Sequence, residues 1–368
     1  MITRKTCLFD DGDLEYIGEY NLPIYQGCVE EDSSDKIEKL VLDISKQTGM
    51  IQVRNLLHLD KVYNHTHNPG TIGQTWKKHH KILSDLISKY EPNCVFEIGG
   101  GHGILANIFL SNYKETRWTI LDPNTKKTNN TYEVINDYFD ENTYIPESVD
   151  MIVHSHFLEH IYNPKYFFEN ISLMRKGIRM VFSVPNLEKL LMKYNPSSLS
   201  FEHTYFCTEE FIDWLLDKSG FEIIEKNYYG QDHSIMYSTI KTDQYKNIDS
   251  PISYEKNSMI FKSFLKYYQD FIESVNETYF NRNQNIFLFG GNVTSQFLLN
   301  NGLDIDIKFL LDNDPTKTNK RLYGTKLIVK NPEIIKEYND PIVIVKSGAY
   351  QNEVIQQLKN INPNVSIL

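Results

Sequence analysis

Two acidic residues and a glycine cluster stand where an α/β protein binds a ligand. Residues 95–106 form an apolar run, a glycine turn and an apolar-periodic segment, which predicts strand, turn and helix. Glycines allow close backbone approach, and the helix start offers unpaired N–H groups. An acid at the end of the next strand can accept hydrogen bonds from a ribose. The predicted ligand contacts are the glycines Gly99, Gly101 and Gly103 and the acids Glu97 and Asp122.

The glycines alone do not identify this ligand, because residues 101–106 also fit the dinucleotide fingerprint in its G/A form. Glu97 favours a cation, since a carboxylate at the strand tip would repel a pyrophosphate. S-adenosylmethionine (SAM), which carries an ammonium group and a sulfonium, therefore fits better than NAD.

A second group of ionisable residues, Glu202 and His203, lies in a predicted loop. The loop runs from a strand ending at Asn186 to a helix that starts near Thr208. Histidine supplies a base of near-neutral pKa, and a neighbouring acid can orient it. Methyl transfer from a sulfonium is an in-line displacement, which mainly requires an aligned acceptor and removal of its proton. We predict His203 as the base and Glu202 and Tyr205 as further catalytic candidates; a helix-capping pair is the alternative.

The pattern E-x-G-x-G-x-G from Glu97 to Gly103, together with Asp122, resembles the class I SAM-dependent methyltransferase superfamily. Residues 150–161, with L-E-H-I, and V-P-N at 184–186 resemble its later motifs. The resemblance implies an α/β fold, a class I methyltransferase Rossmann-like domain, with SAM as the cofactor.

Two more residues are expected around this cofactor. Asp137 follows a predicted strand and is placed to reach the adenine amino group, and His156 lines the pocket at the end of the fourth strand. His156 and His160 can also be read as a catalytic pair. Because methyl transfer needs no second histidine there, we assign His160 to the start of a helix that runs to about Met174.

The first 60 or so residues resemble, in order and spacing, the zinc module of the sugar C-methyltransferase family, which has two C-x-x-C pairs. Here the pairs run from Cys7 to Asp10 and from Ser45 to Thr48, so three ligand positions hold Asp, Ser and Thr. Structural zinc takes thiolates or imidazoles, so we expect the module without metal. The alternative is zinc held by Cys7, Cys28 and nearby acids.

The same resemblance implies further roles. A tyrosine before a long helix lies over the cofactor in that family, and Tyr63 takes this role here. His65 and His67 form an H-x-H in the same loop, which we read as polar surface rather than as metal ligands. The family's Y-x-E-H loop has Ser200 at the tyrosine position here. Carbon methylation needs a stabilised enolate, whereas oxygen methylation needs one base, so both remain open.

A second strand and glycine turn at 286–292 resembles the start of the nucleotide-sugar domain of this family. Its Gly290-Gly291 lacks a full dinucleotide fingerprint, so a purely structural domain is the alternative. The predicted organisation is a small N-terminal β module at 1–62, the methyltransferase domain at 63–240, a helical linker at 241–284 and a C-terminal α/β Rossmann-like domain at 285–368.

Composition bounds the function classes. A chain of 368 residues with 40% hydrophobic content supports several packed cores. A net charge of -10 argues against extended nucleic-acid binding. No apolar run approaches a membrane span, and four scattered cysteines favour a reducing compartment, so we expect a cytoplasmic protein.

These expectations combine into a SAM-dependent methyltransferase that acts on the sugar of a nucleotide-linked sugar. By resemblance, the methylated atom is a carbon next to a keto group. The alternatives are a sugar O-methyltransferase, a catalytically silent protein that binds SAM or a nucleotide, and a dehydrogenase. A homo-oligomer is compatible with the sequence.

Overall fold

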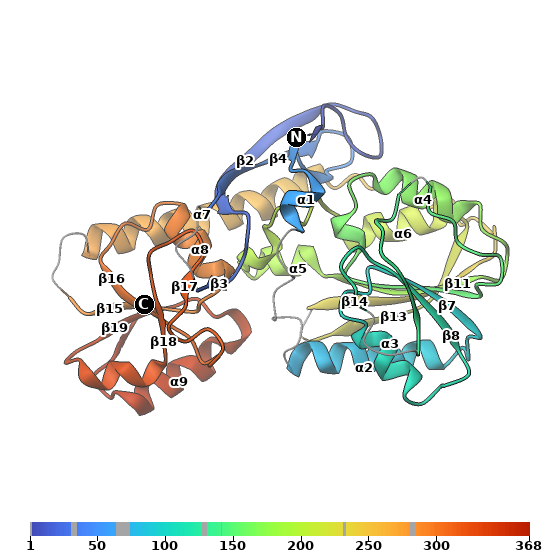
Figure 1. Ribbon diagram of the computed structural model, residues 1–368. Helices are drawn as coiled ribbons and strands as arrows, with labels where there is room; N and C mark the ends of the chain where they lie inside the picture. Colours follow the sequence, from blue (N-terminus) through green and yellow to red (C-terminus); the bar gives the residue numbers. More distant parts are fainter. Residues whose placement is uncertain are drawn as a thin grey trace.

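The computed structural model describes residues 2–30, 35–63, 74–126, 131–140, 142–230, 233–279 and 284–368. Figure 1 shows two α/β lobes, the methyltransferase-like lobe on the right and the C-terminal lobe on the left. The long N-terminal strands β2 (Leu14–Pro23) and β4 (Ile37–Ser45) and helix α7 (Tyr254–Tyr279) lie across the region between them.

The right-hand lobe contains a seven-stranded sheet. Its strands, in spatial order, are β13 (Phe221–Tyr229), β14 (Ser234–Lys241), β11 (Arg179–Pro185), β10 (Met151–Ser155), β7 (Cys94–Ile98), β8 (Arg117–Leu121) and β9 (Glu133–Ile135). Neighbouring strands pair in parallel except β14, which is antiparallel to both β11 and β13. The predicted α/β Rossmann-like fold of the class I type is thus confirmed.

Helices cover both faces of this sheet, because the central strands are apolar on both sides. The strand residue Val95 packs in one core with α2 (Gln74–Ser88) and α3 (Ile104–Leu110). Its neighbour Phe96 packs in the other core with α4 (Pro164–Ser172) and α6 (Glu209–Lys218). The alternation follows from the two-residue period of a strand.

The predicted helix from residue 157 to about Met174 is wrong in its first turns. Residues Leu158–His160 form a short 3-10 turn, η2, and α4 starts only at Pro164. Proline lacks an N–H and favours the first helical position, and Asn163 caps the helix by accepting from the Tyr166 N–H. The η2 turn therefore stands apart from the helix.

The N-terminal module is a four-stranded antiparallel sheet, and one of its strands comes from the right-hand lobe. Its order is β12 (Tyr205–Phe206), β5 (Ile51–Val53), β4 (Ile37–Ser45) and β2 (Leu14–Pro23), and β1 (Ile2–Thr3) pairs separately with β6 (Asn55–Leu56). A one-turn helix, α1 (Leu59–Val62), follows. Because β12 directly follows Glu202 and His203, the module anchors the loop that carries them.

The C-terminal lobe is a second, smaller parallel sheet. Its spatial order is β18 (Val329–Lys330), β16 (Ile307–Leu311), β15 (Ile286–Phe289), β19 (Ile342–Val345) and β20 (Ser366–Ile367), with α8 (Val293–Asn300) and α9 (Gln351–Ile361). In addition, β17 (Arg321–Leu322) pairs with β3 (Cys28–Val29) of the N-terminal region. Residues 242–253 contain no helix, so α7 is the helical part of the expected linker within its described residues.

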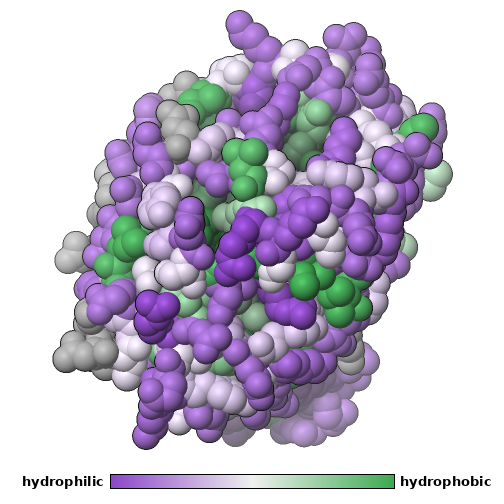
Figure 2. Space-filling model, turned by 90° about the vertical axis from the view of Figure 1, so that its right-hand side faces the viewer, coloured by the Kyte–Doolittle hydropathy of each residue, from purple (hydrophilic) through white to green (hydrophobic). Residues whose placement is uncertain are grey.

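One hydrophobic core runs through the N-terminal sheet, α7 and the C-terminal lobe. Among the helices within the described ranges, none has the length and apolar character needed to cross a membrane. The face of the molecule shown in Figure 2 is mainly hydrophilic, with small separate hydrophobic patches.

Candidate functional site

The glycine turn after β7 has the backbone that the sequence predicts. The Gly99 N–H donates to the Leu121 carbonyl at 2.9 Å, and Gly101 and Gly103 have φ of +53° and +65°. A Cβ on Gly103 would lie 2.5 Å from the Tyr132 hydroxyl, so only glycine fits where α3 begins. A Cβ on Gly101 would meet nothing within 4 Å, so the turn faces open space at that point.

Asp122 lies against this turn. Its Oδ2 accepts the Gly101 N–H at 3.0 Å, and its Oδ1 accepts the Asn124 N–H at 2.8 Å. A carboxylate offers about four lone-pair sites, so these two bonds leave acceptor capacity on both oxygens. The position is suited to a pair of ribose hydroxyls, as predicted from the sequence.

Glu97 is buried beneath the same turn, with 2% of its surface exposed. Its Oε2 accepts a hydrogen bond from Trp118 Nε1 at 2.8 Å, and a Cβ on Gly100 would contact its carboxylate. Burial raises the pKa of Glu97 to about 7. The structure thus places this acid under the turn, bonded to the neighbouring strand; its contact with a cationic ligand stays a prediction.

Asp137 and His156 both lie at the carboxyl edge of the sheet. Asp137 is exposed just after β9, and one of its carboxylate oxygens accepts the Tyr138 N–H at 2.8 Å. His156 has a φ of +49°, and its Nε2 lies 2.8 Å from Ser234 Oγ. Its ring also contacts Trp76 of α2, with centroids 4.7 Å apart. His156 Nδ1 also lies 3.5 Å from Glu159 Oε1, so neighbouring side chains already hold the ring of His156.

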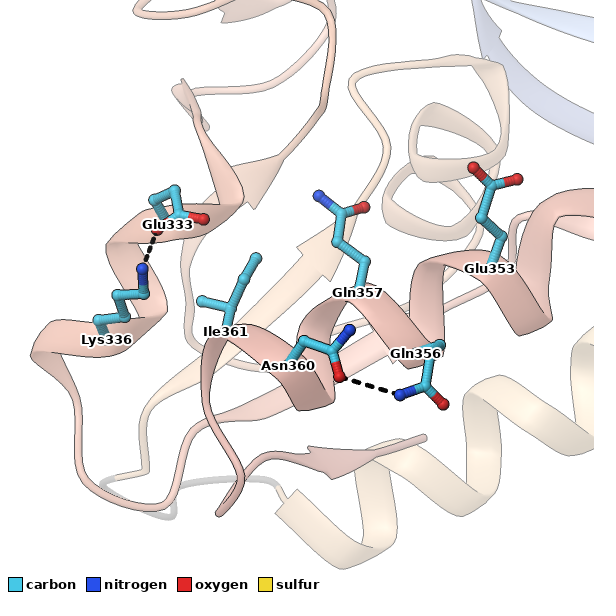
Figure 3. Close-up of a pocket in the computed structure, with 7 residues that line it drawn as sticks. All are labelled: Glu333, Lys336, Glu353, Gln356, Gln357, Asn360 and Ile361. Carbon is cyan, nitrogen blue, oxygen red and sulfur yellow. Dashed lines mark hydrogen bonds and ion pairs between the residues drawn. The ribbon is translucent and has the colours of Figure 1, made fainter.

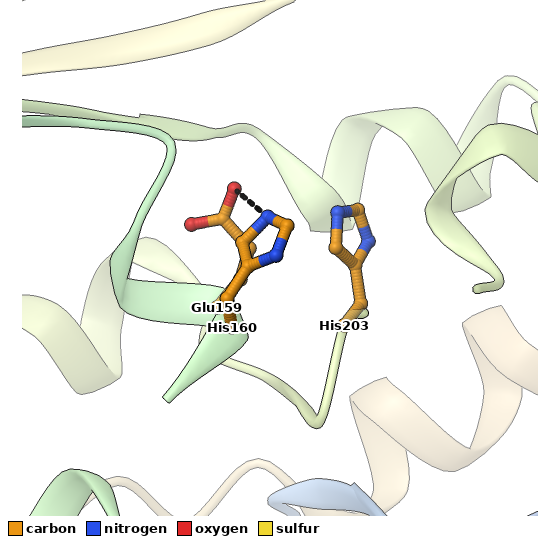
Figure 4. Close-up of side chains that lie close together, drawn as sticks. All are labelled: Glu159, His160 and His203. Carbon is orange, nitrogen blue, oxygen red and sulfur yellow. Dashed lines mark ion pairs between the residues drawn. The ribbon is translucent and has the colours of Figure 1, made fainter. Parts of the chain in front are cut away.

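A cluster of acids and imidazoles forms where η2 meets the loop before β12. Tyr63 Oη lies 3.1 Å from His160 Nδ1, and Glu202 Oε2 lies 3.6 Å from the same nitrogen. His160 Nε2 lies 3.6 Å from Glu159 Oε1, and the rings of His160 and His203 are 5.2 Å apart. Figure 4 shows the His160 ring between the Glu159 carboxylate and His203. The structure thus brings the predicted Tyr63, Glu202 and His203 together.

The loop fixes one tautomer of His203. Its Nδ1 lies 2.9 Å from the Ser198 carbonyl, which only accepts, so Nδ1 carries the hydrogen and Nε2 keeps its lone pair. Ser200 Oγ accepts the backbone N–H groups of Glu202 and His203 at 3.2 Å each. Burial, then the neighbouring His160, lowers the pKa of His203. Burial alone would also lower the pKa of His160, but Glu159 and then Glu202 outweigh it and raise that pKa.

Tyr205 does not take the catalytic position predicted for it. It is fully buried, and its hydroxyl donates to the Leu158 carbonyl at 2.7 Å. Its backbone pairs with Gln52 in the N-terminal sheet. We therefore assign Tyr205 to holding the η2 turn in place.

Glu159 and His160 are the site residues that the sequence analysis missed. The sequence predicts His160 at a helix start, whereas it faces Glu202, His203 and Tyr63 at the end of η2. A signal was present, because the chain has two Glu-His pairs, one after β10 and one before β12. Only the folded chain shows that the two pairs meet.

The four positions that match zinc ligands in the sugar methyltransferases form a hydrogen-bonded knuckle. Asp10 Oδ2 accepts from Ser45 Oγ at 2.9 Å, and Ser45 Oγ accepts the Thr48 N–H at 3.1 Å. Hydrogen bonds, including one from Cys7, outweigh burial and lower the pKa of Asp10.

Cys28 lies at the C-terminal lobe, with its Sγ 3.6 Å from the Gly291 carbonyl. His65 and His67 lie outside the described residues.

The C-terminal lobe repeats the turn geometry of the first lobe. The Gly290 N–H donates to the Leu311 carbonyl at 2.7 Å, as Gly99 does to Leu121. Asp312 accepts the Gly291 N–H at 2.9 Å, as Asp122 accepts that of Gly101. In the C-terminal lobe a lysine is added, with Lys317 Nζ 3.0 Å from Asp312.

A hollow of about 500 Å³ lies on the C-terminal lobe between η4 (Pro332–Glu337) and α9. It is open and polar, and Figure 3 shows that two of its side-chain pairs bond to each other. Its lining residues are Glu333, Lys336, Glu353, Gln356, Gln357, Asn360 and Ile361. None of the predicted site residues lines it.

Comparison with known protein families identifies the central part of the chain. Residues 75–226 match the family model described as a methyltransferase domain. This segment is a methyltransferase domain. The match confirms the predicted enzyme class, a SAM-dependent methyltransferase, and with it the cofactor. The matched residues include β7 to β12 and α6, but neither the long N-terminal strands nor the C-terminal lobe.

Solved methyltransferase structures resemble the chain only in part. Human N-acetylserotonin methyltransferase, in complex with SAM, has 16% identity and a TM-score of 0.39 over 50% of this chain and 58% of its own. The Burkholderia thailandensis 1,6-didemethyltoxoflavin-N1-methyltransferase has 15% identity and a TM-score of 0.38 over 54% and 98%. Synechocystis magnesium protoporphyrin IX methyltransferase has 13% and 0.35 over 45% and 83%. No curated protein sequence matches the chain significantly.

Proposed function

We propose that this methyltransferase transfers a methyl group to the sugar of a nucleotide-linked sugar. The observation that carries the proposal is the closeness of the glycine turn to Phe157, which leads into the acid–imidazole cluster. A Cβ on Gly99 would lie 3.0 Å from the Phe157 ring, and Glu159 and His160 follow within three residues. The segment that touches the cofactor turn therefore continues directly into the proposed acceptor site.

The residues around the turn fit SAM. Gly101 leaves room for a ligand at the turn, and Asp122 keeps acceptor capacity for ribose hydroxyls. Asp137 and His156 stand along the same edge of the sheet, and Tyr63 stands beside them on the acceptor side. When bound, SAM would supply a methyl group on a positively charged sulfur, and the sulfur would keep the electron pair of the broken C–S bond and become the neutral thioether of S-adenosylhomocysteine.

We assign the proton acceptor to His203. With its Nδ1–H donated to Ser198, its Nε2 lone pair takes the proton that the acceptor atom loses as it forms the new bond to the methyl carbon. Glu202, which lies beside His160, stabilises positive charge in this cluster. Ser200 holds the backbone of both residues. The chain thus provides a positioned base. The other requirement for methyl transfer is an acceptor atom held in line with the methyl group.

The nucleotide-sugar substrate is supported by the C-terminal lobe. Its turn repeats the hydrogen bonds of a ribose-binding acid at Asp312, and Lys317 adds a cation next to it, which suits a phosphate. The family resemblance favours methylation of a carbon beside a keto group. Oxygen methylation is the second candidate, because Ser200 stands where the family has a tyrosine and Ser200 Oγ is already engaged by backbone N–H groups.

The test is incubation with labelled SAM and a panel of keto and non-keto nucleotide sugars, read by mass spectrometry. We expect a gain of one methyl group on at least one nucleotide sugar and none on the free sugar. In deuterium oxide, a carbon-methylating enzyme exchanges the proton beside the ketone, whereas an oxygen-methylating enzyme leaves C–H bonds intact. Binding of SAM without transfer to any member of the panel favours the catalytically silent alternative.

A further inference from the structure

Glu159 is an unusual residue for a buried position. Only 2% of its surface is exposed, and neither carboxylate oxygen accepts a hydrogen bond within the described part of the chain. Its ionisable neighbours include two imidazoles, with His156 Nδ1 3.5 Å and His160 Nε2 3.6 Å from Glu159 Oε1. A buried carboxylate without hydrogen bonds is costly, and such groups commonly coordinate a metal or pair with a charge. The two oxygens therefore lack the hydrogen bonds that a buried carboxylate needs.

Two imidazoles stand around this carboxylate at the spacing of ligands on one ion. His160 Nε2 lies 3.6 Å from Glu159 Oε1, which is too long for a hydrogen bond. Two ligands with bonds of 2.0–2.1 Å to a tetrahedral ion lie about 3.3 Å apart. The donor atoms of Glu159, His160 and His203 all lie within 4.8 Å of one another. Binding of one ion therefore requires these donor atoms to approach one another by up to about 1.5 Å.

The outer contacts of both rings are those of metal-ligating histidines. His203 Nδ1–H donates to the Ser198 carbonyl, which leaves Nε2 as the donor atom. His160 Nδ1 faces Tyr63 Oη and Glu202, which leaves its Nε2 toward Glu159. A carbonyl or carboxylate on the second nitrogen fixes the tautomer and orients a histidine ligand in metal sites.

We propose that Glu159, His160 and His203 bind a divalent transition-metal ion such as Zn²⁺ (Figure 4). Two imidazoles and one carboxylate suit Zn²⁺ and leave one coordination position open. A bound ion occupies the lone pair of His203 Nε2, so the metal-loaded protein is inhibited in methyl transfer. This inhibition rests on the proposed function, whereas the binding itself does not.

The binding test uses the full chain without an affinity tag, freed of metal with a chelator. Zn²⁺ is titrated by calorimetry and Co²⁺ by visible absorption. We expect one ion per chain. Glu159→Gln should lower the Zn²⁺ affinity by more than about 100-fold, because loss of an outer partner alone costs 10–100-fold. Asp10→Asn, in the N-terminal knuckle, is the matched control and should keep the ion.

Two outcomes overturn the binding site: no Zn²⁺ bound by the intact chain, or full affinity in both Glu159→Gln and His203→Asn. Unchanged binding of S-adenosylhomocysteine and an unchanged thermal midpoint show that the variants are folded. The inhibition is tested by methyl transfer with and without Zn²⁺, and unaffected turnover with the ion bound contradicts it. If no substrate is ever methylated, the proposed function fails, and calorimetry still decides the metal site.

Discussion

Trp118 Nε1 donates a 2.8 Å hydrogen bond to Glu97 Oε2, and this bond ties the two strands that carry the cofactor acids. Glu97 is the residue before the end of β7 at Ile98, and Trp118 lies in β8, which ends at Leu121 directly before Asp122. Among the described residues, the indole of Trp118 is the single hydrogen-bond donor to the Glu97 carboxylate. One hydrogen bond does not offset the loss of water around a buried negative charge, so the protonated form of Glu97 is favoured.

The first prediction is a pH-dependent stability that originates from Glu97. Its pKa in the folded protein is about 7, above the ordinary value of 4.5, so the folded state binds more protons between these values. Stability without ligand should therefore fall as pH rises through this window, by at most about 3 kcal/mol. Glu97→Gln keeps an acceptor for Trp118 and should remove that loss.

Urea unfolding at pH 5 and pH 8 measures the effect. Asp137→Asn is the control, because that carboxyl group is exposed and should not change the pH dependence. Parallel pH profiles for the unmodified protein and Glu97→Gln would contradict the prediction.

The second prediction concerns cofactor binding. Asp122→Ala removes the proposed ribose acceptor and should weaken both SAM and S-adenosylhomocysteine by about 1–3 kcal/mol, or roughly 5- to 150-fold. Glu97→Gln should weaken SAM more than S-adenosylhomocysteine, because only SAM carries the sulfonium charge. Asp312→Ala, the equivalent acid of the C-terminal lobe, should leave both affinities unchanged. If calorimetry finds that NADH binds more tightly than S-adenosylhomocysteine, the cofactor assignment is contradicted.

The third prediction concerns the N-terminal knuckle. Zinc prefers thiolates in structural sites, and three positions of this knuckle hold oxygen side chains. Ser45 Oγ donates to Asp10 Oδ2 and accepts the backbone N–H of Thr48. The triple substitution Asp10→Cys, Ser45→Cys and Thr48→Cys should therefore create a zinc site with Cys7. Elemental analysis is carried out in a Glu159→Gln background, so that zinc at the new cysteine site is distinguished from zinc at the cluster around His160. One zinc in Glu159→Gln alone, lost on Asp10→Ala, would show that the natural knuckle binds metal.

The fourth prediction separates Tyr205 from the chemistry. Tyr205→Phe removes the hydrogen bond to the Leu158 carbonyl and should lower the free energy of unfolding by about 0.5–1.5 kcal/mol. The turnover per folded molecule should stay within a few-fold. A drop of 100-fold at full folding would return Tyr205 to the acceptor site.

The local parts of the site could be predicted from the sequence. The positive φ angles at Gly101 and Gly103 and the bond from Gly101 to Asp122 follow from a glycine turn between a strand and a helix, with an acid after the next strand. These features depend on short chain segments, so pattern and spacing specify them. The seven-stranded sheet follows from the same alternation of strands and helices.

Features that depend on contacts between distant segments could not be predicted in this way. No pattern shows that Trp118 would draw Glu97 under the turn, or that β12 would join the N-terminal sheet and bury Tyr205. The sequence pattern predicts a helix that includes Leu158–His160, whereas this segment forms a separate 3-10 turn and the helix starts at Pro164. The meeting of the two Glu-His pairs is likewise a tertiary result.

The last prediction tests the base. His203→Asn keeps a polar side chain that can still contact the Ser198 carbonyl, but it removes the Nε2 lone pair. Turnover should fall by about 100- to 10,000-fold, the usual contribution of a general base, while S-adenosylhomocysteine affinity stays nearly unchanged. His58→Asn is the matched control, because His58 is exposed just before α1 and is not among the residues of the cluster around His160.

Deuterium exchange gives this variant a second readout. If carbon is the acceptor, His203→Asn should lose exchange of the proton beside the ketone together with methyl transfer, because one base serves both steps. Retained exchange with lost transfer would mean that another group, such as Glu202 or His160, removes the proton and that His203 only aligns the acceptor. Full activity in His203→Asn would remove it from the mechanism and make Glu202 the next residue to substitute.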